Sequence, residues 1–124
     1  MNLLNLLLIA IGGALGSTAR YLFSLLIQRA SGTLFPIGTF AVNCVGCLGF
    51  GAIAGAAEQR VQIAPELRLL LLVGILGGFT TFSSYAFESF VLVRDGQFAA
   101  ALVNIVGQVI AGLGGMWIGF AISR

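Results

Sequence analysis

Four long apolar segments take up nearly the whole chain. They cover about residues 3–27, 38–57, 67–93 and 98–122, and short polar stretches separate them. A helix of about 20 apolar residues is long enough to cross the hydrocarbon core of a bilayer. The pattern therefore predicts an all-α integral membrane protein with four transmembrane helices. They form a single transmembrane domain over residues 1–124.

The composition supports lipid as the solvent and excludes several classes of function. Of the 124 residues, 59% are hydrophobic and 8% are charged, too few to coat a soluble domain. The chain has no histidine, and its few acidic residues form no cluster. Zinc hydrolysis, Ser-His-Asp catalysis and haem ligation therefore lack their residues, so we do not expect an enzyme. A net charge of +2 is too small to indicate nucleic-acid binding.

The arginines are balanced between the two ends of the predicted bundle. Four spans place both termini on one side, together with Arg60, Arg68 and Arg124. The other side carries Arg29 and Arg94, with Arg20 near it. This balance gives the positive-inside rule no asymmetry to act on. Either other factors set the topology, or both orientations insert and form an antiparallel homodimer. Because four short helices cannot form a pore alone, we expect the dual-topology dimer.

Two helices carry pairs of polar side chains at membrane depth. Thr39 and Asn43 are four residues apart on the second helix, as are Asn104 and Gln108 on the fourth. Residues four apart share one face of a helix. Buried polar groups in a membrane are costly unless they are paired or hydrated. The spacing leaves two interpretations open, namely interhelical hydrogen bonds or a hydrated track.

The middle of the third helix is rich in glycine and hydroxyl residues. Residues 74–85 read GILGGFTTFSSY, and both residue types weaken a helix interior. The segment predicts an unwound break. Irregular backbone at membrane depth is tolerated where it lines a cavity or binds a ligand, although a tightly packed kink is the alternative.

Aromatic, hydroxyl and acidic side chains follow the break. Phe82 and Tyr85 share a face, and they serve either in packing or in presenting their electropositive ring edges to a small anion. Hydroxyls of Ser83 and Ser84 would then help to replace the water lost by that anion. Glu88 is the one acid well inside a span, and it either caps a vestibule or pairs with an arginine such as Arg20.

Pairs of glycines four residues apart recur along the chain and are typical of close helix packing in membranes. With so many glycines, chance matches are expected, so the signal is weak. The pairs are Gly12 and Gly16, Gly51 and Gly55, Gly74 and Gly78, and Gly115 and Gly119.

Three motifs together resemble a known family. They are Gly12-Gly13-Ala14-Leu15-Gly16 with Arg20-Tyr21, Gly38-Thr39 with Asn43, and Gly77-Gly78-Phe79-Thr80-Thr81-Phe82-Ser83. In order and spacing they are similar to the Fluc (CrcB) family of fluoride channels, and the similarity covers the whole chain. Members of this family often carry phenylalanine at the position of Tyr85 and a hydroxyl residue at that of Ala86.

The resemblance implies a passive, fluoride-selective channel that exports fluoride across the bacterial inner membrane through two antiparallel pores of a homodimer. It implies that Asn43 donates its amide to the ion and that Phe82 and Tyr85 face the pore. The further implied pore residues are Thr39, Ser83, Ser84, Asn104 and Gln108, with Arg20 and Glu88 at the vestibule. Backbone carbonyls of Gly77 and Thr80 would hold a structural sodium ion (Na+) at the dimer centre.

Two other classes of protein are alternatives to this resemblance. A small multidrug antiporter of organic cations is also a four-helix protein, but it needs a titratable acid in its first helix. Residues 3–19 contain none, which leaves Glu88 as the substitute. A passive structural subunit of a larger complex would explain the glycines but not the polar pairs.

Overall fold

The computed structural model describes residues 2–59 and 63–124, and within them the chain is helical without any β-strand. The helices are α1 (Leu3–Ser31), α2 (Ile37–Gln59), α3 (Pro65–Arg68), the π-helix η1 (Leu69–Leu76), α4 (Gly77–Phe79), α5 (Phe82–Arg94) and α6 (Phe98–Ile122). The elements from α3 to α5 follow one another as a single interrupted span. Four helical segments are long and apolar enough to cross a membrane, which confirms the predicted fold class at this level.

The ends of the helices follow local chemistry more closely than hydropathy. Helix α1 continues to Ser31, beyond the predicted end at 27, so the polar Gln28 and Arg29 are part of the helix. It ends where Gly32 takes the left-handed conformation, with φ 63°. Glycine occupies this region without strain and commonly terminates helices. Helix α6 has the bounds predicted for the fourth span.

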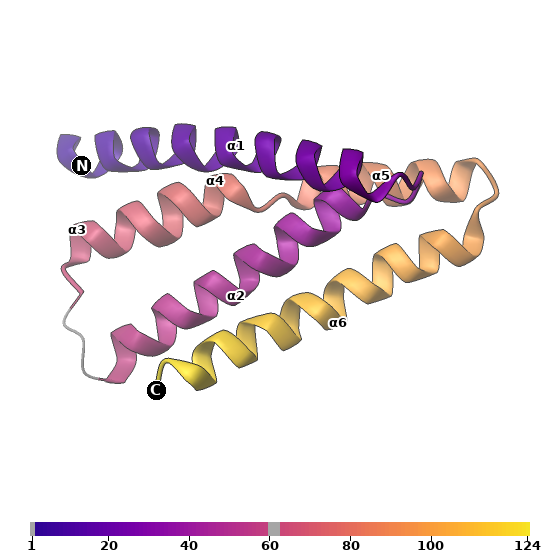
Figure 1. The fold of residues 1–124 in the computed structure, drawn as a ribbon. Helices are drawn as coiled ribbons and strands as arrows, with labels where there is room; N and C mark the ends of the chain where they lie inside the picture. The colour runs from indigo at the N-terminus through magenta and orange to yellow at the C-terminus, as the bar shows by residue number, and fades with distance from the viewer. Residues whose placement is uncertain (1, 60–62) are drawn as a thin grey trace.

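Both termini lie at the same end of the bundle, as four spans require (Figure 1). Helix α3, which carries Arg68, lies at that end too. Arg29 and Arg94 lie in the last turns of α1 and α5, at the opposite end. Arg60, which the predicted charge balance also counts, lies outside the described residues.

Glycine allows two pairs of helices to pack at short range. Helix α2 lies beside α6, and α1 lies beside η1 and α4 (Figure 1). A Cβ atom added at Gly12 would lie 2.9 Å from the Cα atom of Gly74, and one at Gly16 would collide with the carbonyl of Ile75. In the other pair, a Cβ at Gly51 would collide with Met116 on α6. The predicted packing role of these glycines is confirmed.

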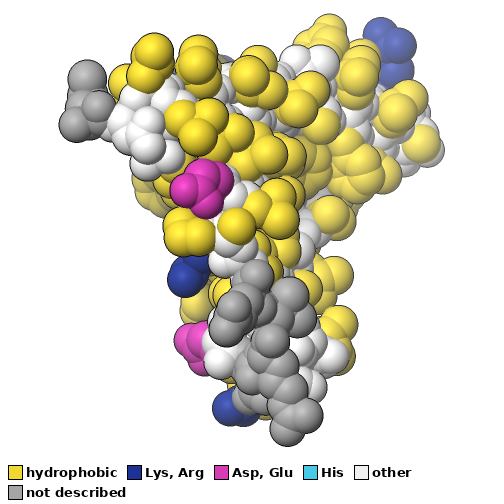
Figure 2. Space-filling model, turned by 90° about the vertical axis from the view of Figure 1, so that its left-hand side faces the viewer, with side chains coloured by type: hydrophobic (Ala, Val, Ile, Leu, Met, Phe, Trp, Pro, Cys, Tyr) yellow, Lys and Arg dark blue, Asp and Glu magenta, His cyan; other side chains and the backbone are white. Residues whose placement is uncertain are grey.

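The exterior of the chain is apolar. Seen from the end that carries the termini, the molecule shows mainly hydrophobic side chains with a few separate charges (Figure 2). Large side chains such as Leu113 and Trp117 on α6 are exposed. Apolar surface of this extent is stable in lipid and not in water.

Candidate functional site

The break in the third span lies at two threonines. Thr80 and Thr81 are both extended, with φ,ψ of −78°,155° and −148°,115°, whereas Gly77 and Gly78 before them remain helical in α4. Thr81 caps α5, since its Oγ1 accepts a hydrogen bond from the Ser84 N–H at 3.2 Å. The predicted break is therefore confirmed, and hydroxyl capping rather than glycine sets its position.

The side chain of Asn43 on α2 holds this broken backbone. The Thr81 N–H donates to Asn43 Oδ1 at 2.8 Å, and Asn43 Nδ2 donates to the Thr81 carbonyl at 3.1 Å. A side-chain amide thus replaces the partners that an unbroken helix would supply, which a buried backbone requires. The break is a built feature of the fold.

A chain of amide hydrogen bonds leads from Asn43 across α6 to α5. Asn43 Nδ2 donates to Gln108 Oε1 at 2.8 Å, and Gln108 Nε2 donates to Asn104 Oδ1 at 2.8 Å. Asn104 Nδ2 then donates to Ser89 Oγ at 2.9 Å. The polar pairs predicted on α2 and α6 therefore form interhelical hydrogen bonds, and both amide hydrogens of Asn43 have acceptors. Asn104 is fully buried and lines neither of the two cavities described next.

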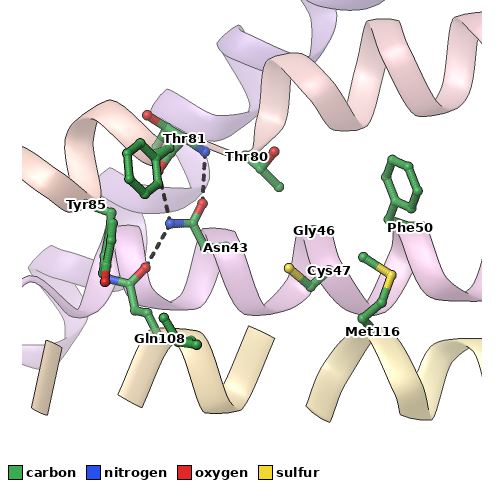
Figure 3. A pocket seen from close by; sticks show the side chains of 11 residues that line it. Asn43, Gly46, Cys47, Phe50, Thr80, Thr81, Tyr85, Gln108 and Met116 are labelled. Atoms are coloured by element: carbon green, nitrogen blue, oxygen red, sulfur yellow. Dashed lines mark hydrogen bonds between the residues drawn. The ribbon is translucent and has the colours of Figure 1, made fainter. Parts of the chain in front are cut away.

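The first cavity has a volume of ≈ 350 Å³ and is open on one side. Its described lining holds no charged side chain and comprises Asn43, Gly46, Cys47, Phe50, Thr80, Thr81, Phe82, Tyr85, Gln108, Val109 and Met116. Figure 3 shows Asn43 at its centre, bonded to Thr81 and Gln108. The cavity combines a cluster of amides with aromatic and aliphatic walls.

Two aromatic residues stand at this cavity. The rings of Phe82 and Tyr85 are 5.5 Å apart and tilted by 48°, so the predicted shared face is confirmed. Tyr85 is anchored, because its hydroxyl donates to the Ile105 carbonyl at 3.0 Å. Phe82 is 79% exposed and has little to pack against within one copy of the chain.

The second cavity, of ≈ 460 Å³, is more polar. It is lined by Ser17, Arg20, Tyr21, Ser24, Leu25, Gln28, Thr39, Val42, Thr81, Ser84 and Glu88. The Thr39 hydroxyl donates to Glu88 Oε1 at 2.6 Å, so α2 and α5 meet at this point. Thr39 and Asn43 thus face the same span, although each lines a different cavity.

One predicted role of Glu88 is an ion pair with Arg20, and the described residues show no such pair. The pair found in the described ranges joins Arg94 and Asp95, at 2.8 Å, on the exposed surface. The hydrogen bond from Arg94 lowers the pKa of the Asp95 carboxyl. Glu88 and Arg20 nevertheless line the same cavity, which brings the two predicted vestibule residues together.

Thr81 and Gln28 are site residues that the sequence did not single out. Thr81 lines both cavities and is buried, and its Oγ1 donates to Ser84 Oγ at 3.0 Å and lies 3.3 Å from Ser83 Oγ. A hydroxyl residue directly before an apolar helical run is an N-cap signal that would have found it. Gln28 carries no such signal, since its role depends on a different segment.

The break also releases backbone carbonyl oxygens, among them those of Gly77 and Thr80. In a continuous helix the N–H groups of Thr81 and Ser84 would donate to the carbonyls of Gly77 and Thr80. Both N–H groups donate to side chains instead. Carbonyl oxygens without helical partners suit a hard cation such as Na+. The donor chemistry at Gly77 and Thr80 therefore fits the predicted cation site.

Comparison with known proteins gives a consistent result. The profile of a family described as "CrcB-like protein, Camphor Resistance (CrcB)" matches residues 7–120. A protein of Maridesulfovibrio salexigens named fluoride-specific ion channel FluC is 52% identical over 118 residues, which cover 95% of this chain and 94% of that protein. Proteins of the same name from Nitratidesulfovibrio vulgaris and Methylobacillus flagellatus are 45% and 44% identical, over 97% of this chain and 97% and 94% of their own lengths.

Proposed function

Because this chain belongs to the CrcB family, we propose that it is a fluoride-specific ion channel. The observation that carries this function is the near full-length similarity to proteins named as such channels. It is a multi-pass protein of the bacterial inner membrane, consistent with its four apolar helices. The antiporter alternative is not supported, because the relatives of this chain are named as channels and residues 3–19 of α1 contain no acid.

The first cavity is the part of the chain best suited to hold a dehydrated anion. Amide hydrogens of Asn43 can donate to it, and the edges of Phe82 and Tyr85 are electropositive. Both amide hydrogens of Asn43 already have acceptors, so the anion would replace one of them, for example Gln108 Oε1. Because no charged side chain among the described residues lines this cavity, an ion held by its neutral groups can leave again, as conduction requires.

The second cavity suits the role of a vestibule. Arg20 attracts anions toward it, and hydroxyls of Thr39 and Ser84 offer donors as water is lost. Thr81 lines both cavities, so a path between them would pass this residue. Ser83 lies beside it. One carboxyl oxygen of Glu88 accepts a hydrogen bond from the Thr39 hydroxyl.

Each channel would be an antiparallel dual-topology homodimer with two pores. The support lies in one copy of the chain, where the first cavity is open on one side and Phe82 is 79% exposed beside it. A second copy in the opposite orientation would cover this side and complete the conduit. The balance of arginines removes the charge bias that would enforce one orientation.

A sodium ion held by the carbonyls of Gly77 and Thr80 would supply fixed positive charge next to the break. The support is the release of these two carbonyls from helical hydrogen bonds. No group of three or more Cys, Asp and Glu side chains gathers within the described residues, and the proposed donors at this site are carbonyl oxygens.

The function is tested by fluoride efflux from liposomes that contain the purified protein. With a potassium ionophore to balance charge, we expect fluoride to run down its gradient to the external electrode, whereas chloride stays inside. Without the ionophore, efflux should stop, because a passive channel moves net charge. Liposomes that retain fluoride while driving proton-coupled dye transport would contradict the proposal.

A further inference from the structure

Gln28 fastens the loop between α1 and α2 through its side-chain amide. Its Nε2 donates to the carbonyls of Thr33 and Phe35, at 2.7 Å and 3.0 Å. Its Oε1 accepts from the Gly38 N–H at 3.1 Å. The amide nitrogen and oxygen of this one side chain therefore form hydrogen bonds with backbone groups five to ten residues further along the chain.

The bond to Gly38 acts as a helix cap supplied by a different helix. Helix α2 begins at Ile37, and its first N–H groups have no partners within the helix. Pro36, which precedes it, has no side-chain acceptor. The amide oxygen of Gln28 therefore does for α2 what a serine or aspartate usually does from the N-cap position.

The same contact fixes how closely α2 approaches α1. A Cβ atom added at Gly38 would lie 2.5 Å from the Ser24 carbonyl oxygen and 2.6 Å from Ser24 Oγ. Ser24 is one turn before Gln28 on α1. The first turn of α2 therefore lies against α1 at Ser24 and is hydrogen-bonded to it at Gln28.

The next residue along α2 is Thr39, which is buried and donates to Glu88 at 2.6 Å. Gln28, Thr39 and Glu88 line the same cavity. We infer that Gln28 is a positioning residue of the vestibule, which fixes the first turn of α2 and thereby sets the Thr39 hydroxyl against Glu88. This inference rests on the proposed function for its effect on conduction, but its structural part stands independently of it.

Hydrogen exchange tests the structural part in the full-length protein. Gln28→Met keeps the length of the side chain but neither donates nor accepts strongly. We expect exchange of the amides in residues 37–40 to speed up roughly five- to tenfold, with α6 unchanged. Unchanged exchange of residues 37–40 in Gln28→Met would overturn the inference.

Fluoride efflux tests the link to Thr39 through a double-mutant cycle. Gln28→Met should lower the efflux rate several-fold. In a Thr39→Val background it should lower it no further, because the hydroxyl that it positions is gone. Additive losses would show that Gln28 does not act through Thr39.

Ser31→Ala is the matched control for both experiments, because it removes a hydrogen bond to the backbone carbonyl of Gln28 in the same turn. We expect it to change neither the exchange rate nor the efflux rate. If wild-type protein carried no fluoride, the proposed function would fail and the exchange measurement would still decide the role of Gln28.

Discussion

Asn43 combines two requirements in one side chain. Its oxygen accepts from the Thr81 N–H and keeps the broken backbone satisfied, whereas its nitrogen holds the hydrogens offered to an anion. An aspartate at this position would keep the acceptor for the Thr81 N–H but lose the donor to the Thr81 carbonyl and the donors offered to an anion.

For Asn43→Asp we expect fluoride efflux to fall by roughly ten- to a hundredfold, because a carboxylate has no donor and repels the anion. The protein should still fold, because the acceptor for the Thr81 N–H remains. Efflux rates and gel-filtration profiles measure the two effects. Asn2→Asp makes the same chemical change at the exposed cap of α1, where the Leu4 N–H keeps its acceptor, and it should conduct normally. Normal efflux in Asn43→Asp at neutral pH would remove this residue from the pore.

Phe82 offers a ring edge from an exposed position beside the cavity. Phe82→Ile removes that edge and the contact with Tyr85, and such aromatic contacts are worth about 0.5–1.5 kcal/mol. We expect efflux to fall by about tenfold, with assembly intact. Phe90→Ile is the control, because Phe90 is exposed on the same helix and lines neither described cavity. Loss of the dimer in Phe82→Ile would instead support the packing interpretation.

Sequence reasoning found single residues when their own chemistry was unusual for a membrane span. Asn43 and Glu88 were found because polar groups there are costly. Gln28 was missed, because its role follows from the loop that folds back over it. Asn104 was grouped with Gln108 by spacing, which could not show that Asn104 is fully buried against Ser89.

At the scale of the elements, backbone contact between α1 and the first half of the third span depends on glycines that differ sharply in their surroundings. A Cβ atom at Gly16 would collide with the Ile75 carbonyl, whereas one at Gly13 would meet nothing within 4 Å. Hence two neighbouring glycines of one motif have opposite tolerance for a methyl group.

We predict that Gly16→Ala destabilises the protein by about 1–3 kcal/mol, because the rigid backbone of η1 must move away. Gly13→Ala should be neutral or stabilising by up to about 1 kcal/mol, since alanine favours the helix. Thermal unfolding in detergent measures both. Equal melting temperatures of the two variants would show that this packing does not limit stability.

The existence of the break was predictable and its internal geometry was not. Hydroxyl and glycine residues at 74–85 indicated a weak helix, but the cap at Thr81 needs the Asn43 side chain from α2 to complete it. The π-helical winding of η1 before the break has no signal in its run of apolar residues, LLLLVGIL. Helix η1 packs against α1, a contact between distant segments that a local pattern does not contain.

At the scale of the whole molecule, the four-helix class follows from hydropathy, whereas orientation and assembly depend on very few charges. We predict that reporter cysteines at the two ends of the bundle are each accessible from outside the cell in about half of the copies. Leu34→Cys places one on the exposed loop before α2, and Ala64→Cys places one at the opposite end. Both are made in a background where Cys44 and Cys47 are alanine, and an impermeant maleimide measures their labelling. Complete labelling of one reporter and none of the other would contradict dual topology.

In the proposed pore, the hydrogens of uncharged amide and hydroxyl groups and the edges of aromatic rings let fluoride pass down its gradient and exclude other ions. The most direct test of this claim is the reversal potential of the purified protein in a planar bilayer, with a fluoride gradient, an opposite chloride gradient and a superimposed pH gradient. We predict that the current reverses close to the fluoride equilibrium potential and that this reversal potential does not change with the pH gradient. Reversal at the chloride or proton equilibrium potential would contradict it.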